Sequence, residues 1–310
     1  MKKYLIYTVT CLMALCMASC GNKEGAAKEN TKKESVVERL KDADIAITNK
    51  VVIDGEAMRQ LPNLKLICVA ATGMNNVDLN AAAELGIEVK NAVGYSTSSV
   101  TETTLASALA LARNIVYFNE YFHDGRYSQA DRAFCYDRLT FELRGKKWGI
   151  IGLGNIGREV ARLASAFGCE VRYFSTSGTK REEAYPAMAL KELLEWSDIV
   201  SVHSPLNDRT RNLVGREELR AMKPSAIIIN VARGGIINEA ALAEALDSGW
   251  IAAAALDVFS VEPLRESPLY DIKDKYRLLA SPHNAWSAVE AIDRLIGCVA
   301  ENIRQWSAKQ

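Results

Sequence analysis

A glycine-rich turn between a predicted strand and a predicted helix constrains this chain more than any other feature. The turn reads Gly-Leu-Gly-Asn-Ile-Gly at residues 152–157; residues 147–151 have the pattern of a short buried strand, and residues 158–164 begin a helix. In such a turn the first glycine makes the bend, the second lets backbone approach a pyrophosphate, and the third lets the helix pack on the strand. The pyrophosphate then lies at the helix N-terminus, where free N–H groups favour an anion. The turn therefore predicts a dinucleotide-binding unit that begins near the middle of the chain.

The segments around the turn predict alternating strands and helices. Strand patterns occur at 45–48, 66–69, 88–90, 147–151, 170–174, 199–202, 226–230 and 253–256. Helical patterns occur at 36–41, 56–61, 79–85, 100–122 and 287–306, while 124–143 is polar and irregular and is predicted to cross between domains. Such alternation indicates parallel sheets. We therefore expect an α/β fold of two doubly wound parallel-sheet domains, in which a Rossmann domain (101–286) is inserted in a flavodoxin-like substrate domain (36–100 and 287–310).

The N-terminal segment has two interpretations. Lys2 and Lys3 precede an apolar run that ends in Met-Ala-Ser-Cys at 17–20, which is the anatomy of a secretory signal and resembles a bacterial lipoprotein signal with Cys20 as its lipidated residue. The polar residues 21–35 would then be a tether. Alternatively, residues 3–10 form the first strand of the outer domain, since Tyr, Ile, Thr and Val favour strands. The first interpretation predicts a membrane-anchored lipoprotein, periplasmic or on the outer face, and the second a cytoplasmic protein.

The composition argues against several other classes. The chain has 38 Lys and Arg residues against 38 Asp and Glu residues, so no global charge attracts nucleic acid. Beyond residue 22 no apolar run is long enough to cross a bilayer. The four cysteines beyond residue 20 are Cys68, Cys135, Cys169 and Cys298, and their spacing is not that of metal ligands. We therefore expect no metal site and predict that these four are small buried thiols.

Three chemically capable residues follow predicted strands of the second sheet. Arg233 follows the strand at 226–230, Glu262 follows the strand at 253–256, and His283 lies in a strand-end loop. Taken singly, the arginine could cap a helix and the glutamate could be a solvated loop residue. Together they supply a fork of donors for a carboxylate, an orienting carboxylate and a titratable base, which hydride transfer at a hydroxyl-bearing carbon requires.

The other two histidines suggest less. His123 follows a helix and is predicted to lie on the surface. His203 ends a predicted strand and is expected in or near the nucleotide site, as a structural residue or as part of an adenine pocket.

From about residue 36 to residue 306 the chain resembles the D-isomer-specific 2-hydroxyacid dehydrogenases. The matching stretches are GLGNIG at 152–157, HSPLNDRTRNLV at 203–214, NVARGGIINEAALAEAL at 230–246, LDVFSVEP at 256–263 and SPHNAW at 281–286. AATG at 70–73 together with HNAW looks most like glycerate dehydrogenases, also named hydroxypyruvate reductases, and their glyoxylate-reducing relatives.

The resemblance implies a set of site residues and a homodimer formed through the nucleotide domain, with the helix at 100–122 as a possible contact. The implied catalytic residues are Arg233, Glu262 and His283. The implied substrate-binding residues are Ala71, Thr72, Gly73, Arg233 and Trp286. The implied cofactor-binding residues are Gly152, Gly154, Asn155, Ile156, Gly157, Ser175, His203, Pro205, Val231, Ala232 and Asp257, the last on the nicotinamide carboxamide.

The resemblance implies an oxidoreductase that transfers a hydride between NAD(P)H and a small 2-keto acid to give a D-2-hydroxy acid. The choice between NAD and NADP stays open, because Ser175 stands where an acidic residue normally binds the ribose 2′-hydroxyl, and Lys180 and Arg181 follow it. The alternative is a catalytically silent, membrane-tethered nucleotide-binding protein. Its substrate domain would be incomplete if the first strand were lost with a signal.

Overall fold

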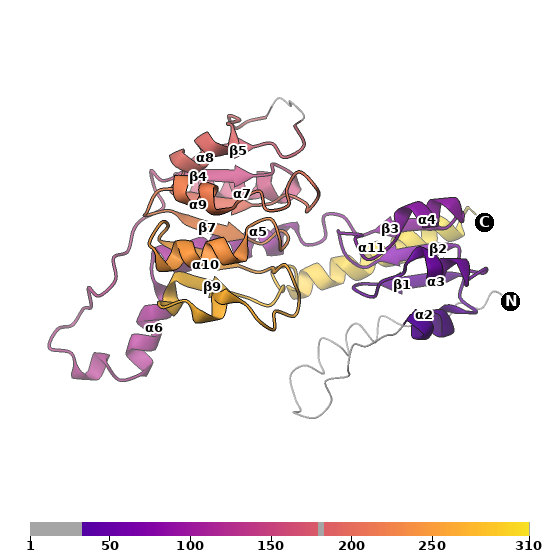
Figure 1. Ribbon diagram of the computed structural model, residues 1–310, viewed down its shortest axis with the longest axis horizontal. Coiled ribbons are helices and arrows are strands. Elements are labelled where there is room, and N and C mark those ends of the chain that lie inside the picture. Colours follow the sequence, from indigo (N-terminus) through magenta and orange to yellow (C-terminus); the bar gives the residue numbers. More distant parts are fainter. Residues whose placement is uncertain (1–32, 179–182, 310) are drawn as a thin grey trace. The chain divides into compact units, whose positions relative to one another are not determined.

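The computed structural model describes residues 33–178 and 183–309 and divides into two compact units (Figure 1). The first unit contains the chain up to Ser96 together with the chain from Val289 onward, and the second unit is the continuous segment Thr97–Ala288. These borders lie within four residues of the predicted ones. The predicted signal segment, the alternative strand at 3–10, most of the tether, and Lys180 and Arg181 lie outside the described residues.

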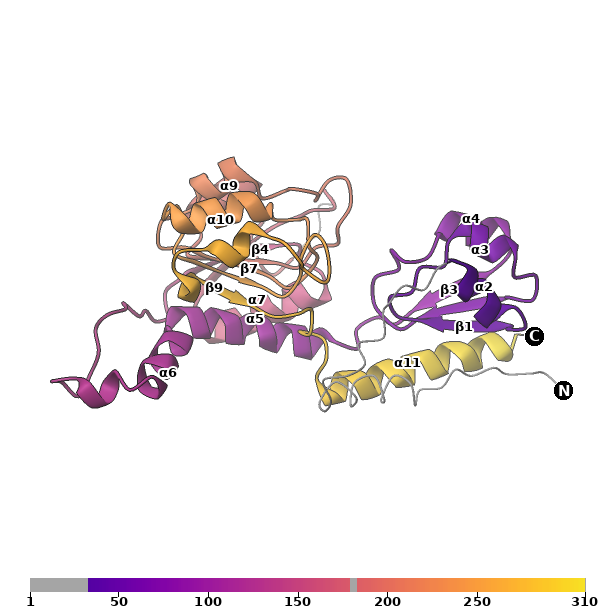
Figure 2. The ribbon, with the colours of Figure 1, turned by 60° about the horizontal axis from the view of Figure 1, so that its bottom comes forward.

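The first unit is built on a parallel sheet whose described strands have the order β1-β2-β3. The central strand β2 is buried along its whole length, since helices cover both faces of the sheet: α2, α3 and α4 lie on one side and the long α11 on the other (Figure 2). The short helices α3 and α4 begin at aspartates, Asp54 and Asp78, whose side chains accept hydrogen bonds from backbone N–H groups of the first turn. Helix α2 begins three residues before the predicted helix. The elements are α2 (Lys33–Leu40), β1 (Ile45–Thr48), α3 (Gly55–Arg59), β2 (Leu66–Val69), α4 (Leu79–Glu84), β3 (Glu88–Asn91) and α11 (Val289–Ser307).

The second unit is a doubly wound sheet of six parallel strands in the order β5-β4-β6-β7-β8-β9. The chain runs from β4 outward to β5 and then crosses to the other side of β4 for the remaining strands. This reversal places a switch point between β4 and β6, where open α/β sheets bind their ligands. The strands are β4 (Lys147–Ile151), β5 (Glu170–Phe174), β6 (Ile199–Val202), β7 (Ile227–Asn230), β8 (Ala253–Leu256) and β9 (Leu278–Ala280).

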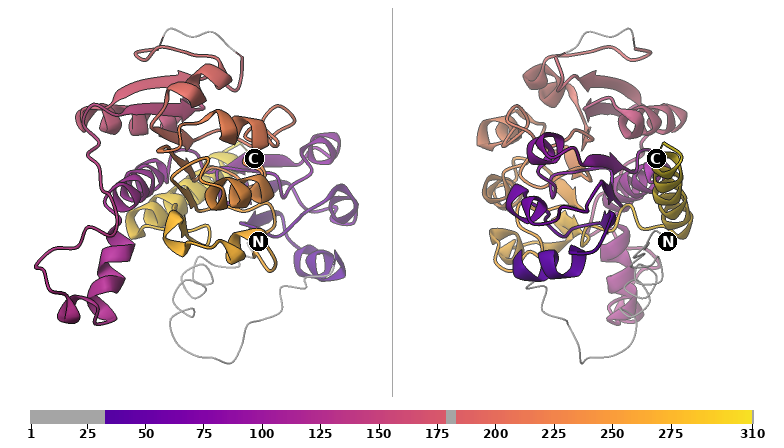
Figure 3. Two further views of the ribbon diagram at one scale, coloured as in Figure 1. Left: turned by 60° about the vertical axis from the view of Figure 1, so that its left-hand side comes forward. Right: turned by 90° about the vertical axis from the view of Figure 1, so that its right-hand side faces the viewer.

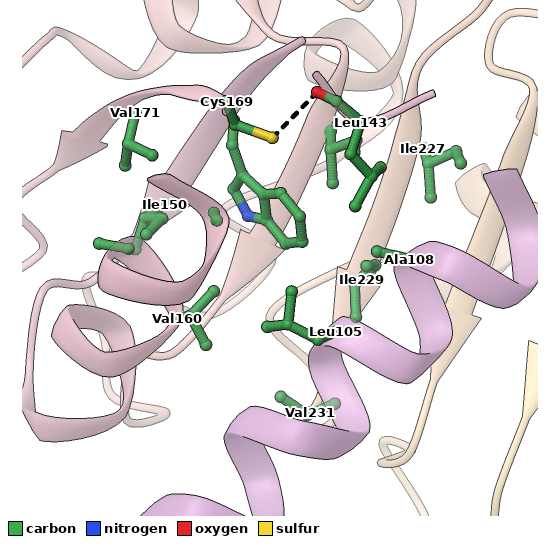
Figure 4. Packing of buried hydrophobic residues seen from close by; sticks show 14 of the residues in the cluster. Leu105, Ala108, Leu143, Ile150, Val160, Cys169, Val171, Ile227, Ile229 and Val231 are labelled. Atoms are coloured by element: carbon green, nitrogen blue, oxygen red, sulfur yellow. Dashed lines mark hydrogen bonds between the residues drawn. The ribbon is translucent and has the colours of Figure 1, made fainter. Parts of the chain in front are cut away.

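Helices cover both faces of this sheet (Figure 2). On one face α5 and α7 enclose a core in which the side chains labelled in Figure 4 interlock, with Cys169 Sγ donating to the Leu143 carbonyl at 3.2 Å. Burial raises the pKa of the Cys169 thiol to about 11, so it stays protonated. Cys68 is buried as predicted, whereas Cys135 and Cys298 are only half-buried. The helices are α5 (Thr97–Ala112) and α7 (Asn155–Ala166) on this face, and α8 (Leu190–Trp196), α9 (Arg216–Ala221) and α10 (Glu239–Asp247) on the other.

The prediction of one helix over 100–122 was wrong. The segment forms α5 and a separate helix α6 (Ile115–His123), because Asn114 adopts a left-handed conformation with φ of 49°. Asparagine tolerates this conformation better than most residues, and its Nδ2 donates to the Leu139 carbonyl at 2.8 Å. The segment 124–143 is also not a domain crossing, since it lies wholly in the second unit and projects from it with α6 (Figure 3). His123, at the end of α6, is exposed as predicted.

The two ends of the second unit meet at one buried side chain. Ser99, near the start of α5, donates from Oγ to the Ala285 carbonyl at 2.6 Å and accepts from the Ala288 backbone N–H at 3.4 Å. The chain thus enters and leaves this unit at adjacent points. Among the residues that the structure describes, no helix combines the length and apolar character needed to span a membrane.

Candidate active site

The three glycines after β4 each meet a different steric demand. Gly152 has φ of 93°, a conformation that side chains disfavour, and a Cβ on it would lie 3.0 Å from the Ser204 backbone nitrogen. A Cβ on Gly157 would lie 2.3 Å from the Gly152 carbonyl oxygen, whereas one on Gly154 would meet no described atom within 4 Å. Among the described residues, no side chain caps α7 at Gly154. The N-terminus of α7 is therefore open to an anion, next to a backbone surface that a ligand can approach.

A pocket lies where β4 and β6 end, at the switch point of the sheet. Two buried side-chain atoms in it, His203 Nδ1 and Ser204 Oγ, have no hydrogen-bond partner among the described residues. Buried polar atoms are normally paired, so these two await a ligand or water. Together with the open turn, they fit a dinucleotide. The lining residues are Gly152, Leu153, Gly154, Tyr173, Ser175, Thr176, Ser177, Glu183, His203, Ser204 and Pro205.

The described charges near Ser175 are those of Arg209, Glu183 and Arg158, while Lys180 and Arg181 lie outside the described residues. The Ser175 and Ser177 hydroxyls lie 3.3 Å apart, and Arg209 Nη1 donates to the Ser177 carbonyl at 3.2 Å. Glu183, which also lines the pocket, forms a two-pronged ion pair with Arg158, and Arg158 Nε lies 3.1 Å from Glu183 Oε2. Sequence reasoning missed Arg209, because it follows β6 and approaches Ser177 only in the fold.

His203 is held neutral in this pocket. Its Nε2 lies 2.9 Å from Ser201 Oγ, and burial lowers the pKa of the imidazole to about 3. The ring therefore stays uncharged at neutral pH, and the structure assigns it no acid–base partner.

The depressed pKa of His203 predicts a loss of stability in acid. In the unfolded chain this histidine titrates near its ordinary pKa of about 6.5, so below that pH the unfolded state binds a proton that the folded state excludes. The folded state is therefore at no disadvantage from His203 above about pH 6.5. Its free energy of unfolding decreases progressively as the pH falls from there toward about 3. Between about pH 7 and pH 5 we expect His203 to remove about 2 kcal/mol from the free energy of unfolding. Urea titrations of the cofactor-free protein at the two pH values should show this loss in the wild type, and the loss should be smaller by about 2 kcal/mol in His203→Gln. The variant His123→Gln, which changes an exposed histidine, should have the same pH dependence as the wild type.

The candidate catalytic residues follow three adjacent strands. Arg233 follows β7, Glu262 follows β8 and His283 follows β9, at the carboxyl edge of the sheet. Glu262 Oε2 lies 2.6 Å from His283 Nδ1, and Glu262 Oε1 accepts from the Phe259 backbone N–H at 3.1 Å. Within the described ranges, His283 Nε2 has no hydrogen-bond partner. The pair can therefore present a ring nitrogen whose orientation a carboxylate fixes.

The turn that carries Arg233 packs directly against the loop that carries Glu262. A Cβ on Gly234 would lie 1.9 Å from the Phe259 carbonyl carbon, so only glycine fits there. Buried Asn230 shapes the turn by accepting from the Ala232 N–H at 3.0 Å and donating to the Arg233 carbonyl at 2.9 Å. The Arg233 guanidinium contacts the Ala232 carbonyl at 2.7 Å, and no hydrogen bond or ion pair among the described residues joins it to Glu262 or His283.

The loop of His283, residues 281–286, is held in an unusual conformation. His283 has φ of 54°, which costs a residue other than glycine roughly 1–2 kcal/mol. The Trp286 indole donates to the His283 carbonyl at 3.0 Å. Asp257, which is 2% exposed, accepts three hydrogen bonds from this loop.

The remaining predicted site residues lie at strand ends. Val231 and Ala232 follow β7, and Asn155 and Ile156 begin α7. Ala71, Thr72 and Gly73 follow β2 in the first unit, where Asn91 Nδ2 donates to the Thr72 carbonyl at 2.7 Å. Among the described residues, no three His, Cys, Asp or Glu side chains gather as metal ligands would.

Comparison with known proteins places this site in context. Residues 105–285 match the family model described as D-isomer specific 2-hydroxyacid dehydrogenase, NAD binding domain. The chain is 40% identical to a protein of Haemophilus influenzae named as a 2-hydroxyacid dehydrogenase, over 90% of this chain and 89% of that one. It is 38% identical to the glycerate dehydrogenase of Methylorubrum extorquens (89% and 86%), and 36% identical to the hydroxypyruvate reductase of Blautia hydrogenotrophica (89% and 86%).

Solved structures show the same fold with both forms of the cofactor. An acyclic imino acid reductase in complex with NADPH and D-Arg matches with a TM-score of 0.81 and 29% identity, over 90% of this chain and 87% of that one. The D-lactate dehydrogenase of Aquifex aeolicus, complexed with NAD and lactic acid, matches with a TM-score of 0.78 and 26% identity, over 88% and 85%.

Proposed function

The chain belongs to the D-isomer-specific 2-hydroxyacid dehydrogenases and uses a nicotinamide dinucleotide, and we propose that its substrate is hydroxypyruvate or glyoxylate, reduced to the D-2-hydroxy acid. The observation that carries the proposal is the 2.6 Å contact between Glu262 and His283, in the same unit as an open dinucleotide turn. Two of the relatives, named as a glycerate dehydrogenase and a hydroxypyruvate reductase, support this choice of a small 2-keto acid.

We assign the proton-transfer role to His283. As general acid its Nε2 would give a proton to the developing alkoxide, while Glu262 orients the ring through Nδ1 and stabilises its protonated form. The Arg233 guanidinium would bind the carboxylate and the neighbouring carbonyl oxygen of the substrate. The bound cofactor supplies the hydride. From the family resemblance, we add the backbone N–H groups at 71–73 and the Trp286 side chain to the substrate-binding set.

An assay of the full chain tests this function. Oxidation of NADPH or NADH, followed by absorbance, should depend on added hydroxypyruvate or glyoxylate. Absence of turnover with either substrate and either cofactor would favour the alternative, a silent nucleotide-binding protein. That alternative is already disfavoured, because the match to the relatives extends over both units.

We further propose that NADP(H) is the preferred cofactor. A 2′-phosphate needs hydroxyl or cationic donors and no facing carboxylate, and Ser175, Ser177 and Arg209 supply these features. Among the described residues that line the pocket, the carboxylate of Glu183 is neutralised by an ion pair with Arg158.

Replacing Ser175 by Asp is expected to reverse this preference. The new carboxylate would repel a 2′-phosphate and accept from a ribose 2′-hydroxyl, so the ratio of kcat/KM for NADPH to that for NADH should fall at least about tenfold. Steady-state kinetics with both cofactors measures the ratio. Ser177→Ala, which removes a hydroxyl without adding charge, is the matched control and should change the ratio less. An unaltered ratio in Ser175→Asp would contradict the assignment of this position.

We propose that the protein is a homodimer assembled through the second unit. Large apolar patches on a protein surface usually mark an interface, and seven large apolar side chains of α6 and the segment that follows it are exposed. Light scattering should then give twice the 34.1 kDa chain mass. The exposed residues are Ile115, Val116, Phe122, Tyr127, Phe134, Tyr136 and Leu139.

We also propose that the N-terminal segment is used as a lipoprotein signal and that Cys20 carries a lipid anchor. The charged start, the apolar run and the small residues before the cysteine support this proposal. The mass of the N-terminal peptide of the native protein tests it, and an unprocessed Met1 would favour the cytoplasmic alternative.

A further inference from the structure

We infer that Asp257 is a positioning residue, which keeps the loop of His283 in its left-handed conformation by accepting three hydrogen bonds from that loop. The inference rests on the proposed function, because it assigns Asp257 a role only through His283. It also differs from the role implied by the family resemblance, contact with the nicotinamide carboxamide.

The contacts of Asp257 converge on one short loop. Its Oδ1 accepts from Ser281 Oγ at 2.7 Å and from the Asn284 backbone N–H at 3.0 Å, and its Oδ2 accepts from the Ala285 backbone N–H at 3.0 Å. These donors lie on both sides of His283 in the sequence. The carboxylate therefore fixes the two ends of the segment whose middle residue is the proposed general acid.

Asp257 is itself firmly placed. It directly follows β8, is 2% exposed, and its backbone N–H donates to the Asn230 carbonyl at 3.0 Å. Asn230 also shapes the turn of Arg233. The position of the His283 loop is therefore fixed by residues at the ends of β7 and β8, and Arg233 also follows β7.

The loop needs such a clamp because its conformation is unfavourable by itself. A histidine at φ of 54° persists only where surrounding contacts over-determine it. Besides Asp257, the loop is held by Ser99, which donates to the Ala285 carbonyl, and by Trp286, which donates to the His283 carbonyl. In both of these contacts the Ser99 or Trp286 side chain is the donor and a loop carbonyl is the acceptor. In the described structure, Asp257 is the side chain that accepts hydrogen bonds from the backbone N–H groups of this loop.

Only a carboxylate can satisfy all three donors. An asparagine has one acceptor oxygen, so in either orientation of its amide at least one backbone N–H of the loop, that of Asn284 or that of Ala285, faces an NH₂ group. Asp257→Asn should therefore release the loop while preserving size and shape.

The test compares Asp257→Asn with a double variant that also carries His283→Asn. Asn suits the left-handed conformation, so His283→Asn removes the imidazole without a new backbone conflict. If Asp257 acts through His283, kcat in Asp257→Asn should fall about 100-fold, as expected for a misplaced catalytic group. Adding Asp257→Asn to His283→Asn should then lower kcat less than threefold further. The dissociation constant of NADPH, measured by fluorescence titration, should change less than threefold.

Two outcomes would overturn the inference. One is a loss of cofactor affinity in Asp257→Asn with kcat unchanged at saturation, which would place Asp257 on the cofactor alone. The other is multiplication of the two effects in the double variant, which would show a role independent of His283. If His283→Asn itself leaves kcat unchanged, the proposed function fails instead, so the two failures can be told apart.

Ser281→Ala is the milder variant should Asp257→Asn fold poorly. It removes one of the three donors and leaves both backbone contacts intact. We expect a kcat about three- to tenfold below wild type, which is about one-quarter to one-half of the effect of Asp257→Asn on a logarithmic scale, and the same lack of additivity with His283→Asn. Full activity in Ser281→Ala together with full additivity would contradict the clamp.

Discussion

His283→Asn is expected to lower kcat/KM for the keto acid by about 10³-fold or more, while NADPH binds as in wild type. General acid–base catalysis by a positioned side chain contributes about 10²- to 10⁴-fold, and an Asn side chain cannot supply the proton. The dinucleotide turn and the pocket after β6 are untouched by the change. Steady-state kinetics and a fluorescence titration with NADPH measure the two effects separately.

A matched control is available because the chain has only three histidines. His123→Gln changes an exposed imidazole at the end of α6 and should leave kcat/KM within about twofold of wild type. Turnover at the wild-type rate in His283→Asn would refute the assignment of the general acid.

The second large effect is expected from a single added methyl group, in Gly234→Ala. The new Cβ would lie 1.9 Å from the Phe259 carbonyl carbon, so the turn of Arg233 or the loop of Glu262 must shift. A displacement of about 1 Å at a catalytic group costs about 10²-fold in rate, and we expect kcat/KM to fall by at least that factor. Overpacking should also lower the free energy of unfolding by about 1–3 kcal/mol.

Gly297→Ala separates the clash from the mere addition of a methyl group. Gly297 lies in α11, and a Cβ there would meet no atom of the residues that the structure describes within 4 Å. Alanine at this helical position should stabilise the protein by about 0.5–1 kcal/mol and leave the kinetics unchanged. If Gly234→Ala retained wild-type kcat/KM and stability, the close approach of the two loops would not matter for function.

Much of the fold could be predicted because its strands are short, apolar and buried. Strands β4, β5, β6 and β8 have the predicted bounds, and β7 differs by one residue. The break at Asn114 could not be predicted, since no Pro or Gly marks it and the left-handed residue is stabilised by Leu139, distant in sequence. Strand β9 was missed because three residues give no periodicity, and it is a strand only through its pairing with β8.

Some contacts of the site could be predicted from the sequence and others could not. Glu262 and His283 come together because they follow the neighbouring parallel strands β8 and β9. Sequence reasoning placed Glu262 after β8, whereas it placed His283 only in a strand-end loop. Arg209 beside Ser177 and Phe259 against Gly234 are contacts between loops, set by how the strands are ordered and how the backbone bends after each one. No residue-type pattern encodes them. The signal for Gly234 was present only as the first of two glycines after Arg233.

The bridging role of Ser99 has a consequence for how the molecule is assembled. Thr97 and Ala288 lie at adjacent points, so the two ends of the inserted unit are held close together once it has folded. Insertion of this segment into the chain of the first unit therefore costs little loop-closure entropy. The inserted unit is one continuous segment that contains the dinucleotide turn, the proposed acid–base pair and Arg233. Substitutions confined to the first unit would therefore leave the dinucleotide turn and the proposed acid–base pair unchanged.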